Sequence, residues 1–293
     1  MSVPREILQK VRRIEIRTRS VVESVLSGTY HSAFKGRGME FSEVREYTEG
    51  DDIRFIDWNV TARSGKLHVK KHVEERELTV MLVVDASASG NFGSAGKFKA
   101  EVGVELCALL AFSAIKNNDR VGLIIFTDTV EKYIPPKKGR NHVLRVIREL
   151  LFFEPQGRKT DIALALRFLN RVQRRRAVVF MVSDFFCADY STPLRIASRR
   201  HDFVALGLQD RREREIPAMG LIDLLDPETG RTVCVNSSSR RWRRAFTAAA
   251  ARRERERLAF FRTNRIDYIP LMTDADYIEP LVRFFRTRER TAA

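Results

Sequence analysis

The chain has 293 residues and is strongly basic, with 53 Lys and Arg against 38 Asp and Glu and a formal net charge of +15. This length fits one large or two modest domains. The composition, with 44% hydrophobic and 31% charged residues, excludes a chain disordered by composition. No apolar run reaches the roughly 18 residues of a membrane helix, and the N-terminus lacks an apolar signal core, so we expect a cytoplasmic protein without a membrane span.

The first expected element is an amphipathic helix over residues 4–26, which ends before Gly28. Residues 32–77 have poor periodicity and many charges, so we expect an irregular segment that depends on specific polar contacts. From residue 78 onward, apolar runs of strand length alternate with helical patterns. The expected strands are 78–84, 121–126, 130–134, 177–182, 203–208 and 266–271, with a short pair around the turn 226–230; the expected helices are 97–116, 141–151, 161–173, 192–199, 239–263 and one from Asp276.

This alternation predicts an α/β fold with a doubly wound, mostly parallel sheet. The run 78–84 is apolar almost throughout, as is typical of a strand that helices cover on both faces. Strands 121–126 and 130–134 enclose a short turn and predict a hairpin at the sheet edge. We expect three regions: an N-terminal helix with a charged segment over 1–77, an α/β domain over 78–210, and an extension over 211–293 that completes the fold.

Side chains that carry oxygen follow two of the predicted strands. Asp85, Ser87 and Ser89 come directly after the strand 78–84 at alternate positions. Asp184 follows a later strand, and Thr160 stands where a helix opens. In an open parallel sheet, ligands bind outside the carboxyl ends of the strands where the strand order reverses, so we expect these side chains to lie together. An oxygen-only set of this kind suits a hard divalent cation such as Mg²⁺.

The pattern Asp85-x-Ser87-x-Ser89, with Thr160 and Asp184 downstream, resembles the metal-ion-dependent adhesion site of von Willebrand factor type A domains. The resemblance implies that the α/β domain has this fold. It also implies that the three hydroxyls contact a weakly bound Mg²⁺, with Mn²⁺ as the second candidate. The two aspartates would then act directly or through water. One coordination position would remain for an acidic side chain of a partner protein.

Two departures from that pattern stand near the expected site. Arg158 and Lys159 directly precede Thr160, and two cations that point toward a metal would weaken its binding. Gly90 stands where related sequences often have methionine, a difference that we expect to affect packing more than ligation.

A second set of motifs lies between residues 36 and 77: Gly36-Arg37-Gly38-Met39-Glu40-Phe41, Val44-Arg45-Glu46-Tyr47, Gly50-Asp51-Asp52-Ile53-Arg54, Ile56-Asp57-Trp58-Asn59, Thr61-Ala62-Arg63 and Glu74-Glu75-Arg76-Glu77. These motifs resemble a bacterial family of unknown function, DUF58, whose members often carry a von Willebrand type A-like domain. The resemblance implies association with a MoxR-type AAA+ ATPase and a chaperone-like role in the assembly or maturation of another protein complex.

Three other patterns point to different functions. Arginine clusters at 171–176, 199–200, 211–214 and 240–244 suit a nucleic-acid-associated protein, although intermixed glutamates favour solvated helix faces. Carboxylates between residues 40 and 57 suit a two-metal hydrolase, but interleaved arginines favour structural ion pairs. His68 and His72 have the spacing of a helical zinc pair without its glutamate, which favours a surface or packing role.

The sequence therefore predicts a protein that is not an enzyme. We expect an adaptor that docks a carboxylate-bearing client through a Mg²⁺-dependent site and works with a MoxR-type AAA+ ATPase. A basic nucleic-acid-associated protein is the first alternative, and a metal-dependent hydrolase is the second.

Overall fold

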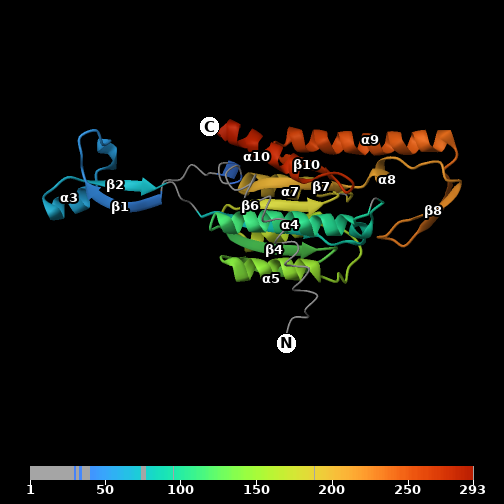
Figure 1. Cartoon of the computed structure of the whole chain (residues 1–293), viewed down its shortest axis with the longest axis horizontal. Helices are drawn as coiled ribbons and strands as arrows, with labels where there is room; N and C mark the ends of the chain where they lie inside the picture. Colours follow the sequence, from blue (N-terminus) through green and yellow to red (C-terminus); the bar gives the residue numbers. More distant parts are fainter. Residues whose placement is uncertain are drawn as a thin grey trace, which may run out of the picture. The chain divides into compact units, whose positions relative to one another are not determined.

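The structure is a computed structural model that describes residue 30 and residues 33–34, 40–73, 77–94, 96–187 and 189–292 (Figure 1). The chain divides into two compact units, of which the smaller spans residues 34–77 and the larger includes all residues from 78 onward. The helix expected over 4–26 lies outside the described residues, as do parts of the first and last DUF58 motifs, at 36–39 and 74–76.

A six-stranded sheet forms the centre of the larger unit (Figure 1). Its spatial order is β10-β7-β6-β3-β4-β5, and all neighbours are parallel except β5, which runs antiparallel to β4 at one edge. The chain runs outward from β3 in one direction, returns to β6, and runs outward in the other direction. The predicted doubly wound, mostly parallel sheet is confirmed. The strands are β3 (Thr79–Asp85), β4 (Arg120–Phe126), β5 (Val130–Lys137), β6 (Val178–Ser183), β7 (Asp202–Gln209) and β10 (Asp267–Met272).

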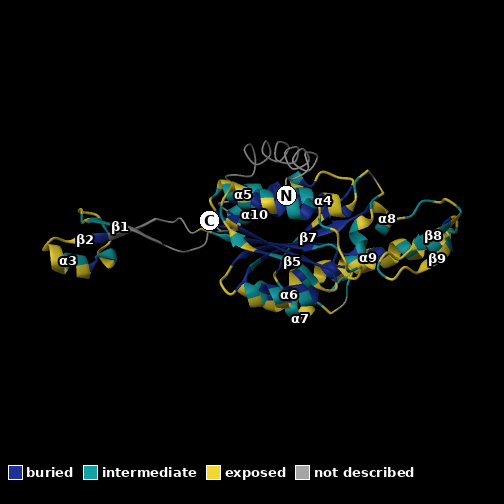
Figure 2. Cartoon of the chain, turned by 90° about the horizontal axis from the view of Figure 1, so that it is seen from below, coloured by how far each residue is buried: buried dark blue, intermediate teal, exposed yellow. Residues whose placement is uncertain are grey.

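Helices cover both faces of this sheet (Figure 2). On one face lie α4 (Lys99–Lys116), α5 (Arg140–Leu151) and α10 (Ile278–Ala292), and on the other lie α6 (Ile162–Val172) and α7 (Ser191–Arg200). Strands β3 and β6 are consequently buried along almost their whole length, which explains their unbroken apolar sequence. No helix in the described part of the chain is long and apolar enough to cross a membrane.

The long basic helix α9 (Arg240–Thr263) is anchored to the sheet near its C-terminal end. Phe261 is 1% exposed and belongs to the same core cluster as Leu166 of α6 and Leu194 of α7. Its ring stacks on Tyr268 of β10 at 4.6 Å and meets Phe185 edge-on at 5.3 Å. The segment after residue 210 therefore contributes both core and a sheet strand to this unit.

A short hairpin lies between the four-residue helix α8 (Arg211–Arg214) and α9. Its strands β8 (Leu221–Leu225) and β9 (Thr232–Asn236) are antiparallel, as the predicted turn at 226–230 requires. Asp226 shapes this turn, because its Oδ1 accepts a hydrogen bond from the backbone N–H of Glu228 at 3.0 Å. Both strands are described throughout, and neither contains a buried residue.

The smaller unit is more regular than its sequence indicates. Strands β1 (Glu40–Glu46) and β2 (His68–Val73) form an antiparallel pair with a bulge between Phe41 and Glu43. Between them lie a 3-10 helix, η2 (Ile53–Phe55), and α3 (Trp58–Ser64). The irregular segment expected here is therefore a β-hairpin with a long connection, which carries no short-turn signal in the sequence. His68 and His72 lie on a strand, so their spacing is not that of a helical zinc pair.

The carboxylates of the smaller unit make structural contacts. Arg45 donates to both carboxylate oxygens of Asp51, at 2.8 and 2.6 Å, and this contact lowers the pKa of Asp51 to about 2. Asp57 caps α3 by accepting the backbone N–H of Asn59 at 3.0 Å. Lys66 pairs with Glu46 at 2.8 Å. These contacts match the interpretation of this charge pattern as structural ion pairs.

His201, at the end of α7, is a buried histidine with a depressed pKa. Its side chain is 2% exposed, and neither ring nitrogen has a hydrogen-bond partner within the described residues. Burial, together with the charges of Arg200 and Arg176, lowers its pKa to about 4. Because the pKa of an unfolded histidine is about 6.5, only the unfolded state binds a proton between these values, so stability falls as the pH decreases through this window.

We expect His201→Leu to lose less stability on acidification than the wild type. The difference between the two proteins should grow by about 2 kcal/mol from pH 7 to pH 4.5. Free energies of unfolding from urea titrations at both pH values would measure it. Parallel pH dependences would show that protonation of His201 does not contribute to acid sensitivity.

Candidate metal site

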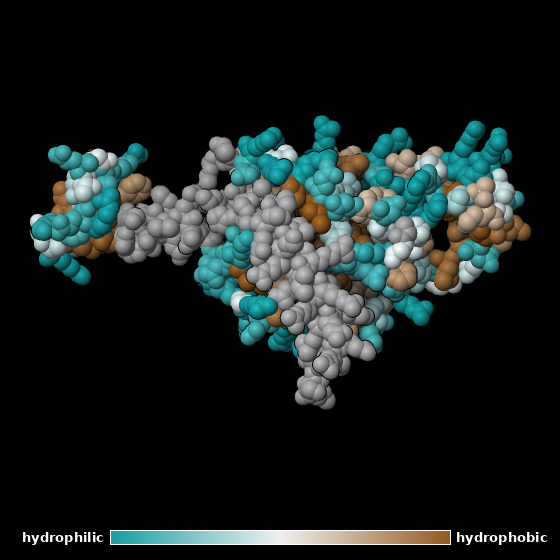
Figure 3. Space-filling model, viewed as in Figure 1, coloured by the Kyte–Doolittle hydropathy of each residue, from teal (hydrophilic) through white to brown (hydrophobic). Residues whose placement is uncertain are grey.

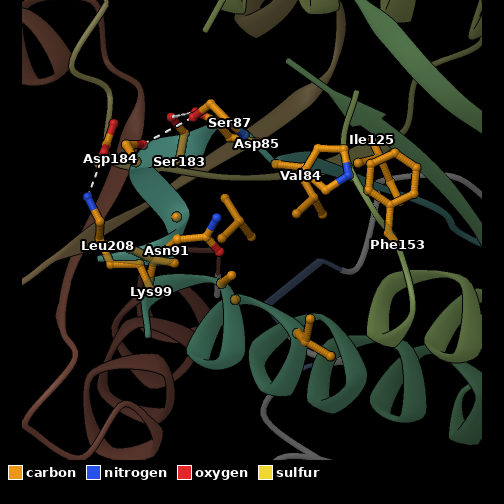
Figure 4. A pocket seen from close by; sticks show the side chains of 18 of the residues that line it. Val84, Asp85, Ser87, Asn91, Lys99, Ile125, Phe153, Ser183, Asp184 and Leu208 are labelled. Carbon is orange, nitrogen blue, oxygen red and sulfur yellow. Dashed lines mark hydrogen bonds and ion pairs between the residues drawn. The ribbon is translucent and has the colours of Figure 1, made fainter. Parts of the chain in front are cut away.

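The predicted site lies where the sheet changes its winding direction. Asp85 ends β3 and Asp184 follows β6, and these two strands are neighbours at the centre of the sheet. The hydroxyl of Ser183 donates to Oδ2 of Asp85 at 2.7 Å, which ties the two strand ends together (Figure 4). This is the position at which open α/β sheets bind ligands, because the loops at the switch point separate and leave a crevice.

The loop after β3 brings three of the predicted residues together. Oδ1 of Asp85 accepts the backbone N–H of Ser87 at 3.0 Å, and the hydroxyl oxygens of Ser87 and Ser89 are 3.1 Å apart. Adjacent ligands of an octahedral Mg²⁺ at 2.0–2.1 Å lie about 3 Å apart. The spacing of the two serine hydroxyls therefore suits neighbouring positions on such an ion.

The loop that carries Thr160 is fixed against the same strand ends. The backbone N–H of Ala88 donates to the carbonyl of Arg158 at 3.0 Å, which joins this loop to the loop after β3. The carboxylate of Glu131 accepts three hydrogen bonds, from the N–H groups of Gln156 and Gly157 at 2.8 and 2.9 Å and from the hydroxyl of Thr127 at 2.6 Å. Glu131 thus positions Thr160 indirectly, a role that its sequence position gave no reason to expect.

A substitution of Gly157 tests this loop. A Cβ there would overlap the side chains of Thr127 and Asp128, and Thr127 is fully buried. We expect Gly157→Ala to lower the free energy of unfolding by about 1–3 kcal/mol through overpacking. Gly90→Ala is the matched control, because its Cβ would meet Ala100 at an ordinary 3.5 Å. Equal urea midpoints for the two variants would contradict the close approach.

Thr160 already contacts a carboxylate. Its hydroxyl donates to Oε1 of Glu228 at 2.9 Å, and Glu228 stands in the turn of the β8–β9 hairpin. Burial raises the pKa of Glu228, and the charge of Asp184 adds to the effect. A hydroxyl keeps two acceptor lone pairs while it donates, so Thr160 remains able to bind a cation.

The other predicted aspartate, Asp184, is bound to a buried lysine. Nζ of Lys99 lies 2.7 Å from Oδ2 of Asp184 (Figure 4). It lies 2.6 Å from Oε1 of Glu213, and the lysine side chain is 3% exposed. Oδ1 of Asp184 accepts the backbone N–H of Phe186 at 3.1 Å. Both oxygens of Asp184 are thus engaged, so contact with a metal through water fits this carboxylate better than direct contact.

The cation beside the site is therefore Lys99. Arg158 and Lys159, which the sequence placed next to the metal, have exposed side chains. Burial alone would lower the pKa of Lys99, but the carboxylates of Asp184 and Glu213 outweigh it and raise that pKa. Four carboxylates, those of Asp85, Asp184, Glu213 and Glu228, stand against two buried cations, Lys99 and Arg257, so the formal charge of this group remains negative, which favours a divalent cation.

Asp85, at the half-buried end of β3, has a raised pKa. Its burial raises its pKa to about 6, and the nearby charge of Asp184 adds to the shift, although the hydrogen bonds from Ser183 and Ser87 oppose it. A cation near a buried carboxylate favours its ionised form. The oxygen ligands of Asp85, Ser87, Ser89 and Thr160 therefore fit Mg²⁺ or Mn²⁺, and Asp184 would contact such an ion through water.

A cavity of about 110 Å³ lies beside this site, between the sheet and α4. Figure 4 shows Val84, Ile125 and Phe153 along one side of it and the polar residues of the site along the other. The apolar wall keeps water away from one side of Asp85, which accounts for the desolvation of that carboxylate.

Sequence comparison assigns the chain to a family. The model of the family described as "Protein of unknown function DUF58" matches residues 43–257. The chain belongs to the DUF58 family. An uncharacterized protein of Mycobacterium tuberculosis, Rv1480, is 33% identical to it over 285 residues, which cover 96% of this chain and 90% of the relative. An uncharacterized protein of Mycobacterium avium, MAV169, is 31% identical over 54% of this chain and 95% of the relative.

Solved structures similar to this DUF58 protein have low sequence identity. The conserved hypothetical protein BatB from Bacteroides thetaiotaomicron is 15% identical, with a TM-score of 0.46 over 73% of this chain and 99% of that one. An aerotolerance-related membrane protein from Bacteroides fragilis is 17% identical, with a TM-score of 0.47 over the same shares. The SpRpn10 VWA domain is 11% identical, with a TM-score of 0.37 over 71% of this chain and 95% of that one.

Several residues around the candidate metal site were not predicted. Lys99 lies at the start of α4. That helix was predicted from the spacing of its apolar residues, and its lysines were given no role. Arg257, 8% exposed on α9, donates to the backbone carbonyl of Asp184 at 2.8 Å, although α9 was expected to present its arginines to solvent. The pattern Asp210-x-x-Glu213 is a capping-box signal that would have placed Glu213 at a helix start.

The arginines of α9 also bear on the nucleic-acid alternative. Arg252 pairs with Glu256 at 2.9 Å, and Arg214 of α8 contacts Glu254. These two pairs make Arg252 and Arg214 less available for phosphates.

Proposed function

We propose that this DUF58 protein is a non-enzymatic adaptor that captures a carboxylate-bearing partner protein through a divalent-cation site. Ser87, Ser89 and Thr160 would hold the ion through their hydroxyls. Asp85 would supply the nearest carboxylate, and Asp184 would act through water. When bound, the ion would supply a positive centre that accepts an acidic side chain.

The observation that supports this proposal best is the pair of serine hydroxyls, 3.1 Å apart beside Asp85 at the switch point of the sheet. Ser183 holds the Asp85 carboxylate, and Arg257 holds the backbone of Asp184, so both aspartates keep their places before a cation arrives. Such preorganisation lowers the entropic cost of forming a ligand set.

The partner that suits this site is an acidic protein. The chain has a net charge of +15, which attracts acidic surfaces and speeds their association. The resemblance to DUF58 members associated with MoxR-type AAA+ ATPases makes such an ATPase, or the complex that it helps to assemble, our proposed partner. In the smaller unit, the engagement of Glu46, Asp51 and Asp57 in ion pairs and a helix cap speaks against the hydrolase alternative.

Thermal unfolding in EDTA, Mg²⁺ and Mn²⁺ tests the cation site. We expect the wild type to gain about 2.7 kcal/mol at one hundred times the dissociation constant, which is a shift of a few degrees. Asp85→Ala should lose this shift. Asp85→Asn keeps the shape of the side chain and separates loss of charge from loss of packing. Equal shifts in the wild type and both variants would place the cation elsewhere.

Partner capture tests the adaptor role itself. The immobilised wild type should retain the MoxR-type AAA+ ATPase of the same organism in Mg²⁺ and release it in EDTA, whereas Asp85→Ala should retain little in either buffer. Retention that is the same in EDTA and Mg²⁺ would contradict a cation-bridged contact.

A further inference from the structure

The turn of the β8–β9 hairpin presents one carboxylate to the site. Asp226, Pro227, Thr229 and Gly230 are exposed, whereas Glu228 between them is half-buried and accepts the Thr160 hydroxyl at 2.9 Å. The turn fixes this direction, because Asp226 holds the backbone N–H of Glu228 at 3.0 Å. The site thus already receives the chemical group that a docking partner would offer.

The hairpin that carries Glu228 is weakly anchored. Across β8 and β9, which are described in full, every residue is exposed or half-buried. Leu221, Leu225 and Val233 are 74%, 63% and 58% exposed, and Figure 3 shows hydrophobic side chains gathered over this hairpin. A segment with so little buried apolar surface opens at a low free-energy cost.

We propose that Glu228 is an internal ligand that closes the cation site and that an acidic side chain of the partner must displace. This inference rests on the proposed function and adds its regulation. Docking would require the hairpin to lift, so the closed hairpin lowers the apparent affinity for any single carboxylate by the fraction of open molecules. Only a partner with further contacts would displace it, and the exposed leucines of the lifted hairpin are available for such contacts.

Removal of this carboxylate from the full-length protein tests the proposal. Hydrogen exchange over residues 221–236, measured without metal, reports whether Glu228 holds the hairpin. We expect Glu228→Ala to speed exchange at the turn by about tenfold, because a hydrogen bond to a charged group is lost. Asp223→Ala is the matched control, since it removes an exposed carboxylate from β8 of the same hairpin.

Mn²⁺ titration of the same three proteins reports on ligation. Glu228→Ala should raise the dissociation constant for Mn²⁺ by roughly tenfold. Acetate should restore the affinity of this variant but leave the wild type and Asp223→Ala unchanged, with sodium chloride at equal ionic strength as the reference. Rescue by acetate would show that a free carboxylate takes the vacated position.

The outcomes separate the two proposals. Equal Mn²⁺ affinity in the wild type and Glu228→Ala, without an acetate effect, overturns the internal ligand and leaves the proposed function standing. If none of the three proteins binds Mn²⁺, the cation-dependent function is overturned, and hydrogen exchange alone decides on the hairpin. Faster exchange in Glu228→Ala then supports closure by Glu228, and unchanged exchange overturns it.

Discussion

Replacing Lys99 with Met is expected to lower the free energy of unfolding by about 3–5 kcal/mol, because it removes one partner of a buried ion group. The ammonium lies 2.7 Å from Asp184 and 2.6 Å from Glu213, with 3% of its side chain exposed. Methionine fills a similar volume, so the loss reports on two carboxylates left without their shared cation. Urea unfolding in EDTA measures it.

Two comparisons make this result specific. Lys97→Met removes a lysine two residues earlier, which pairs with Glu105 at 2.7 Å but is 33% exposed, and we expect a loss of only about 0–1 kcal/mol. Adding Asp184→Asn to Lys99→Met should recover part of the loss, since the two residues are in contact and their effects are coupled. Equal losses for Lys99→Met and Lys97→Met would contradict a special role for the buried lysine.

Lys99→Met also tests the cation site. If Mg²⁺ binds beside Asp184, it can neutralise the carboxylates that Lys99→Met leaves unpaired. We therefore expect Mg²⁺ to stabilise Lys99→Met more than it stabilises the wild type. An equal effect of Mg²⁺ on the two proteins would indicate that the ion and the lysine do not share a carboxylate.

Phe261→Ala is expected to lower the free energy of unfolding by a similar amount, about 3–5 kcal/mol, because it leaves a cavity in the core. Phe261 is 1% exposed and stacks on Tyr268 of the edge strand β10. The variant should therefore loosen both α9 and β10. Denaturant unfolding followed by circular dichroism measures the loss, and hydrogen exchange shows whether β10 loosens with α9.

Leu258→Ala is the matched control on the same helix. Leu258 is 41% exposed, so its truncation should change stability by no more than about 0.5 kcal/mol. Similar losses for the two variants would show that α9 is not held through its buried face.

The fold could be predicted from the sequence because the sheet is covered on both sides. Full burial makes β3 and β6 continuous apolar runs, and the helices between them repeat their apolar residues at helical spacing. The hairpin of the smaller unit could not be predicted because its two strands are separated by more than twenty residues and carry charges. Its pairing depends on contacts that no local pattern encodes.

The candidate site likewise contains residues that could be predicted from the sequence and residues that could not. Asp85, Ser87 and Ser89 are close in sequence, so their pattern indicated their proximity. Lys99 and Arg257 act across long sequence separations, and a single lysine or arginine in a helix carries no signal of the carboxylate or carbonyl that it will meet. Glu228 was recognised only as part of a turn, because which way a turn residue points depends on tertiary packing.

The position of β10 has a consequence for how the protein is made. Strand β7 pairs with β6 on one side and with β10 on the other, and β10 is encoded nearly sixty residues later. At about 5–20 residues per second, a ribosome needs roughly 3–12 s to synthesise the intervening chain. Throughout that interval the nascent protein has an apolar strand with an open edge, which is the kind of surface that pairs with other chains. Synthesis of this protein therefore includes a period in which ribosome-associated chaperones have a specific strand to protect.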